Sequence, residues 1–83
     1  MKFKAEIDIM PLKALLDPQG KAVTSSLKNL NLSEIENVRI GKHISLEIEA
    51  KDKATAEAKV NEACKGLLAN HLMESFEFQL EEI

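Results

Sequence analysis

Hydrophobic and polar residues alternate strictly at the start of the chain, between Lys2 and Met10. Apolar side chains occupy every second position of this stretch: Phe3, Ala5, Ile7 and Ile9. Charged residues stand between them. Because successive side chains of a strand point to opposite faces of a sheet, this period of two predicts a half-buried strand.

The spacing changes to that of a helix between Pro18 and Leu30. Val23, Leu27 and Leu30 are separated by four and three residues, which places them on one helical face. Asp17 is the expected N-cap of this helix. Proline suits the first helical position, because its missing N–H group would be unpaired there in any case.

Two strands joined by a tight turn are predicted between residues 35 and 50. The first carries Ile35, Val38 and Ile40, and the Gly41-Lys42 pair follows it. The second alternates strictly over residues 44–50. Glycine adopts positive φ without strain, so this pair fits a hairpin turn.

A second helix and a last strand complete the pattern. Asp52 is the expected N-cap, and Asn70 lies near the end of the helix. Apolar residues repeat between them at helical spacing: Ala56, Val60, Ala63, Cys64 and Leu67. Residues 75–80 alternate again. The order β-α-β-β-α-β predicts an α+β ferredoxin-like two-layer sandwich, in which two helices cover one face of a four-stranded sheet.

The 83 residues are expected to form one domain, residues 1–83, close to the lower size limit for a core that is stable unaided. The composition, 45% hydrophobic and 30% charged, is that of a globular domain. The core must be mainly aliphatic, because the only aromatic residues are Phe3, Phe76 and Phe78. Such a thin core favours association with other chains.

Charge and cysteine content exclude several classes of protein. The net charge is −3 and no basic stripe is present, which argues against a nucleic-acid partner. The single cysteine, Cys64, cannot form an intramolecular disulfide or a cysteine-rich zinc site, and we expect it to be buried. A free thiol and the absence of an apolar run of membrane-spanning length predict a cytoplasmic protein without a membrane partner.

The open face of the predicted sheet is polar and carries both signs of charge: Lys2, Lys4, Glu6, Asp8, Arg39, His43, Ser45, Glu47, Glu49, Ser75, Glu77 and Gln79. This face has no aromatic residue on which RNA bases could stack. The two histidines, His43 and His71, are not at metal-ligand spacing and are expected to be surface residues. We therefore predict no catalytic residue and no metal site in this chain.

Gly20 is not explained by capping. Glycine in the first turn of a helix costs up to about 1 kcal/mol relative to alanine, so we expect another backbone to approach Gly20 closely. An anion site is less favoured, because the Asp17 carboxylate already occupies the positive end of the helix. At the Gly41-Lys42 pair one alternative to a plain turn stays open: Arg39 and this lysine could lie near a partner's carboxylate or phosphate.

Three separated stretches carry a resemblance to a known family: "LLDPQGKAV" at residues 15–23, "VRIGKHISLEIEA" at residues 38–50, and "CKGLLAN" at residues 64–70 with Glu74 shortly after. Their order and content resemble the PurS family, the small subunits of bacterial and archaeal phosphoribosylformylglycinamidine (FGAM) synthase. The similarity covers nearly the whole chain.

The resemblance implies an accessory role in the fourth step of de novo purine synthesis, within a C–N ligase complex that uses glutamine as amide donor. In that family a PurQ glutaminase releases ammonia. A PurL synthetase uses ATP and magnesium to activate the amide of formylglycinamide ribonucleotide, and ammonia then displaces phosphate. The small subunit would bind no cofactor. It would form a dimer that can exchange strands or pair into a tetramer, and would bridge the other two subunits.

The polar and glycine residues within the matching stretches are the predicted subunit-interface positions: Asp17, Gln19, Gly20, Arg39, Gly41, Lys42 and Asn70. An alternative from another class is a stand-alone metabolite-sensing dimer of the same fold. Such a dimer would be stabilised by an amino acid or a nucleotide.

Overall fold

The computed structural model describes residues 1–13, 17–70 and 72–83. Its elements, in chain order, are β1 (Lys2–Pro11), α1 (Pro18–Asn29), β2 (Lys42–Glu49), α2 (Lys53–Ala63) and β3 (Glu74–Glu82). A π-helical turn, Cys64–Leu68, extends α2. The predicted α+β class is confirmed. No helix in the described part of the chain is both long enough and apolar enough to cross a membrane.

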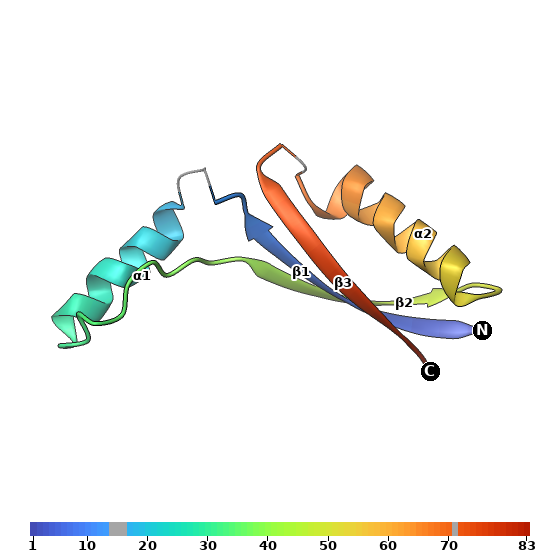
Figure 1. The fold of residues 1–83 in the computed structure, drawn as a ribbon, viewed down its shortest axis with the longest axis horizontal. Helices are drawn as coiled ribbons and strands as arrows, with labels where there is room; N and C mark the ends of the chain where they lie inside the picture. The colour runs from blue at the N-terminus through green and yellow to red at the C-terminus, as the bar shows by residue number, and fades with distance from the viewer. Residues whose placement is uncertain (14–16, 71) are drawn as a thin grey trace.

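β1 is the central strand of a three-stranded antiparallel sheet with the order β2-β1-β3 (Figure 1). The register pairs Ile7 with Ile44 on β2 and with Phe78 on β3. Apolar residues of all three strands therefore share one face, and charged residues share the other. The alternation in the sequence predicted this division for each of the three strands.

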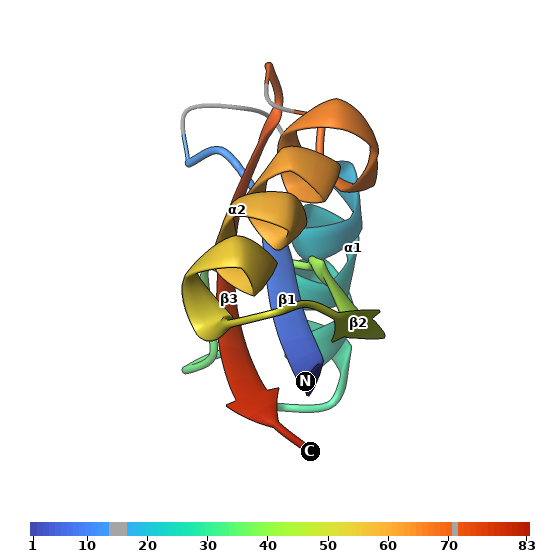
Figure 2. The same ribbon diagram turned by 90° about the vertical axis from the view of Figure 1, so that its right-hand side faces the viewer.

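α2 lies over β1 and β3 on the apolar face (Figure 2) and builds the core together with them. The largest fully buried side chains are Phe3, Ile7, Ile9, Val60 and Cys64. Burial raises the pKa of the Cys64 thiol, as expected for a group that is costlier to ionise away from water. The prediction that this cysteine is a buried, free thiol is confirmed.

The predicted strand at residues 35–40 is wrong for this chain. This segment lies beside α1, and its backbone is bonded to side chains of that part of the chain instead of to a neighbouring strand. The Val38 N–H donates to Thr24 Oγ1 at 3.2 Å, and the Ile40 N–H donates to Asp17 Oδ2 at 3.0 Å. In the described part of the chain the element order is therefore β-α-β-α-β, with three strands in the sheet.

α1 does not cover the sheet, contrary to the prediction. It extends beyond the end of the sheet at which β1 finishes (Figure 1). The radius of gyration, 16.5 Å, exceeds the value of about 12 Å for a compact chain of this length. On the predicted apolar side of α1, Val23 is 38% exposed, and Leu30, at its end, is 67% exposed. The chain thus presents apolar surface that it does not bury by itself.

Candidate functional site

The seven predicted interface residues form two groups near the carboxyl end of β1. One group surrounds the start of α1, and the other joins the start of β2 to the start of β3. The first contains Asp17, Gln19, Gly20 and Arg39; the second contains Gly41, Lys42 and Asn70. Gln19 is exposed in the first turn of α1. Their part in subunit contacts stays a prediction, but their positions are now defined.

Asp17 holds two segments together. Its Oδ1 accepts a hydrogen bond from the Gly20 N–H at 3.0 Å, which confirms the predicted N-cap. Its Oδ2 accepts a second bond from the Ile40 N–H, also at 3.0 Å. These two donors, Gly20 first, hold the pKa of the Asp17 carboxyl below its usual value. The second bond joins residues 23 positions apart, and no local sequence signal predicts it.

Gly20 and Gly41 both allow another backbone to come close. A Cβ atom at Gly20 would lie 2.2 Å from the carbonyl oxygen of Val38, so the predicted close approach of a backbone is confirmed. A Cβ at Gly41 would lie 2.2 Å from the carbonyl oxygen of Ile9. Gly41 does not have positive φ. The predicted hairpin turn is therefore corrected: this glycine lets the backbone come close to β1 where β2 begins to pair with it.

The sequence predicted that Arg39 lies on the polar face of the sheet. This prediction is wrong, because the segment that carries Arg39 lies outside the sheet. Its Nη2 donates to the carbonyl oxygen of Pro11. Lys42 Nζ lies 3.9 Å from Glu74 Oε2, and the other oxygen of Glu74 accepts a bond from the Asn70 N–H at 2.8 Å. Glu74 thus connects two predicted interface residues, and Lys42 has a carboxylate partner within the chain.

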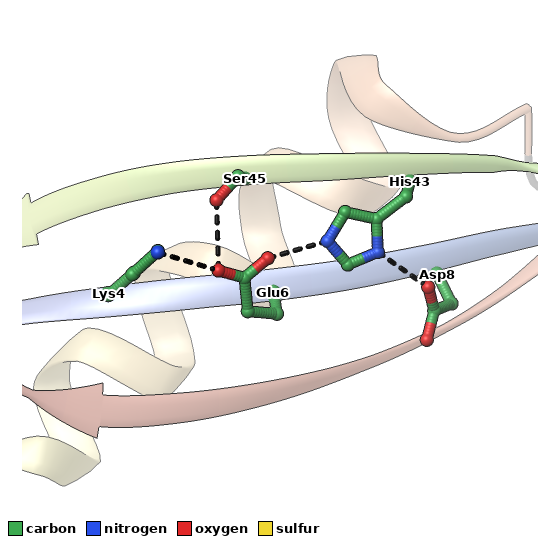
Figure 3. Close-up of polar contacts among 5 residues, drawn as sticks. All are labelled: Lys4, Glu6, Asp8, His43 and Ser45. Atoms are coloured by element: carbon green, nitrogen blue, oxygen red, sulfur yellow. Dashed lines mark hydrogen bonds and ion pairs between the residues drawn. The ribbon is translucent and has the colours of Figure 1, made fainter.

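A second polar cluster lies on the open face of the sheet (Figure 3). His43 stands between two carboxylates of β1: Nε2 is 2.5 Å from Glu6 Oε2, and Nδ1 is 2.7 Å from Asp8 Oδ1. Ser45 Oγ donates to Glu6 Oε1 at 3.0 Å, and Lys4 Nζ lies 3.2 Å from the same oxygen. The interpretation of His43 as a surface residue is confirmed, since its side chain is 52% exposed. Its pairing was not predicted, although the strand register that creates it follows the alternation.

The geometry of this cluster suits charge pairing and not proton transfer. Asp8 and then Glu6 raise the pKa of His43, which favours the imidazolium form, and both ring nitrogens are engaged. Bonds from His43, Ser45 and Lys4 lower the pKa of Glu6 to about 2. A general base needs a free nitrogen within reach of the proton it takes. The described parts of the chain contain no group of three side chains suited to a metal ion, and His71 lies outside them.

We expect His43 to titrate above 6.5 and Glu6 near pH 2 in an NMR titration. A raised histidine pKa stabilises the fold below pH 6.5, and this contribution is lost as the pH rises through the folded pKa. A lowered carboxyl pKa stabilises it above pH 4.5, and this contribution is lost as the pH falls towards 2. The cluster therefore contributes most to stability between pH 4.5 and pH 6.5.

The matched control for this titration is a His43→Gln variant, in which the upper pH dependence should disappear. Glu77 and Gln79 of β3 line the same part of the face and remain unchanged in both proteins. A His43 that titrates at or below 6.5 in the wild-type chain would contradict the pairing.

Comparison with known proteins gives one consistent family. The family model of PurS, described as phosphoribosylformylglycinamidine (FGAM) synthase, matches residues 4–82. The FGAM synthase subunit PurS of Bacillus subtilis is 36% identical over 81 residues, which cover 98% of this chain and 95% of the relative. The PurS subunit of Synechocystis is 43% identical over 67 residues, which cover 81% of this chain and 67% of the relative.

Solved structures of PurS are similar in fold as well. A C2 crystal form of B. subtilis PurS is 36% identical with a TM-score of 0.87, covering 96% of this chain and 99% of that chain. A chain of the PurLQS structure from Thermotoga maritima is 32% identical with a TM-score of 0.89, covering 98% and 99%. The three-stranded sheet with two helices is thus similar to that of solved PurS chains.

Proposed function

Because the chain belongs to the PurS family of FGAM synthase subunits, we propose that it is a non-catalytic accessory subunit that bridges the glutaminase and synthetase subunits. In this role it holds the two partners so that ammonia released from glutamine reaches the synthetase without loss. The reaction forms a C–N bond in de novo purine synthesis. Bond making and breaking take place in the partner subunits.

The observation that carries this proposal is the match to a chain of PurLQS along 98% of this chain. The cluster around His43 supports a non-catalytic role, because its acid and base groups neutralise one another. ATP and magnesium are assigned to the synthetase partner, as the family resemblance implies. The relatives named above are all PurS proteins, so the alternative of a metabolite-sensing dimer gains no support from them.

We propose that the subunit acts as a homodimer. α1 lies off the sheet and leaves apolar side chains at and beyond its end exposed, among them Leu30 and Ile35. On the sheet, Phe76 and Phe78 are stacked with their ring centroids 6.4 Å apart and are only half-buried. A second copy would cover such surfaces.

A cytoplasmic location belongs to the same proposal. The only cysteine of the chain, Cys64, is a free and buried thiol. Free thiols are typical of reducing compartments, and this supports the location that the biosynthetic role implies.

The test is the rate of FGAM formation by the matching synthetase and glutaminase subunits, with and without this chain. With glutamine as nitrogen source, we expect at least a tenfold higher rate (about 1.4 kcal/mol in barrier) when the chain is present. With free ammonia, which needs no transfer between subunits, we expect a much smaller difference. Equal rates with and without the chain, for both nitrogen sources, would refute the bridging role.

A further inference from the structure

A hollow of about 420 Å³ opens between α1 and residues 37–39, away from the sheet. Three basic side chains line it: Lys13, Lys21 and Arg39. They come from the turn after β1, from α1 and from the segment that follows α1. Asp17 is the only acidic residue among the described residues of the lining. The fold therefore gathers positive charge here, from three separate parts of a chain whose net charge is negative.

This positive charge is not neutralised within the described residues. Lys2, Lys4 and Lys42 each have a carboxylate within 4 Å. None of the basic residues of the hollow forms such a pair with a described residue. The Asp17 carboxylate attracts Arg39 and offsets only part of this charge, because one negative group faces three positive ones among the described lining residues. The hollow is consequently a candidate site for negatively charged groups.

The lining favours carboxylates of a protein over a nucleotide. Among the described residues of the lining, Val38 is the only apolar one and none is aromatic, so they offer a base no surface on which to stack. A compact free phosphate is usually held by backbone N–H groups. Here the nearby N–H groups of Gly20, Val38 and Ile40 are already bonded to Asp17 and Thr24.

The remaining donors are long side chains on an open surface, together with Ser25 and Asn37 at its edge. Lysine and arginine side chains reach carboxylates of a second protein readily and steer its approach. α1 and residues 37–39, between which the hollow lies, extend beyond the sheet (Figure 1).

We infer that the hollow formed by Lys13, Lys21 and Arg39 docks an acidic segment of a partner subunit, with at least two carboxylates entering it. This inference rests on the proposed function, and it specifies which surface of the chain recognises the partner and by which chemistry. The interaction should weaken as salt concentration rises, because exposed charges are screened.

The test compares two charge reversals on the same helix. Lys21→Glu changes the hollow, whereas Lys28→Glu changes an exposed lysine of α1 that does not line it. Binding of the full-length chain to the synthetase and glutaminase subunits is measured at low and at high salt. We expect Lys21→Glu to weaken binding about tenfold at low salt, Lys28→Glu to change it less than about twofold, and Lys21→Arg to retain wild-type affinity.

Each other outcome has a definite meaning. If wild-type chain binds and both reversals weaken binding equally, the hollow is not the docking site. Stabilisation by inorganic phosphate or ATP that Lys21→Glu abolishes would assign the hollow to a free anion and overturn the acidic segment. If sedimentation shows that Lys21→Glu, but not Lys28→Glu, converts a dimer into monomers, the hollow binds a second copy of the chain instead of a partner subunit. If the wild-type chain does not bind the partners at all, the proposed function fails and this docking inference fails with it.

Discussion

Gly20→Ala is expected to separate residues 38–40 from α1 and to lower the free energy of unfolding by about 1–3 kcal/mol. The added Cβ would lie 2.2 Å from the Val38 carbonyl oxygen and 2.6 Å from Asp17 Oδ2. Neither atom can move freely, because the Val38 oxygen belongs to the backbone and the Asp17 carboxylate is fixed by bonds to two backbone N–H groups. Alanine favours the helix by up to about 1 kcal/mol over glycine, and the clash must exceed this gain.

Gly66→Ala is the matched control. Gly66 also lies in a helical turn, but a Cβ added there has no neighbour within 4 Å. We expect this variant to stay within about 0.5 kcal/mol of wild type, or to gain slightly. Urea unfolding compares the two variants, and hydrogen exchange of the Val38 and Ile40 amides locates the change. Equal unfolding midpoints, with unchanged exchange of both amides, would show that the contact at Gly20 is not tight.

The Gly20→Ala variant also tests the link between the fold and the proposed role. The core of sheet and α2 lies apart from this contact (Figure 1), so the altered subunit should keep its fold. The hollow, in contrast, is lined by residues on both sides of the contact, Lys21 and Arg39 among them. Gly20→Ala should therefore lower the affinity for the partner subunits even under conditions in which the variant remains folded.

The elements that the sequence predicted correctly are those set by local chemistry. Apolar and polar residues alternate around Ile7, as they do in a strand with one buried face, and the structure has a strand there. Asp17 and Asp52 cap the helices that follow them. The segment at residues 35–40 shows the limit of such reasoning. Its apolar spacing suits a strand, but the hydrogen-bond partners of its backbone, Thr24 and Asp17, lie elsewhere in the chain.

The candidate site was predictable only in part. Gly20 was identified because capping did not explain it, and the structure supplies the missing reason in the Val38 carbonyl. The hollow could not be predicted, since Lys13, Lys21 and Arg39 come together only once residues 35–40 leave the sheet. Periodicity and capping rules carry no information on contacts between such distant positions, so the basic character of this surface emerges from the tertiary fold alone.

Ile7→Ala is expected to be strongly destabilising, with a loss of about 2–5 kcal/mol in the free energy of unfolding. Ile7 has no exposed surface and stands in the central strand, opposite Ile44 and Phe78. Its removal leaves a cavity in a core that has few large side chains to fill it. The total stability of a small domain is about 5–15 kcal/mol, so this loss would remove a large part of it and lower the unfolding temperature.

Leu67→Ala is the control for this change, because Leu67 is 83% exposed beyond α2. Its truncation should alter the stability of the isolated subunit by less than about 0.5 kcal/mol. Thermal unfolding at several protein concentrations separates two sources of stability. The core within each chain contributes equally at every concentration, whereas contacts between chains contribute more as the concentration rises and more chains associate. If Ile7→Ala unfolds at the wild-type temperature at every concentration, the sheet and α2 do not provide the main stability. The subunit would then owe its fold to the surfaces around α1 that a single chain leaves exposed.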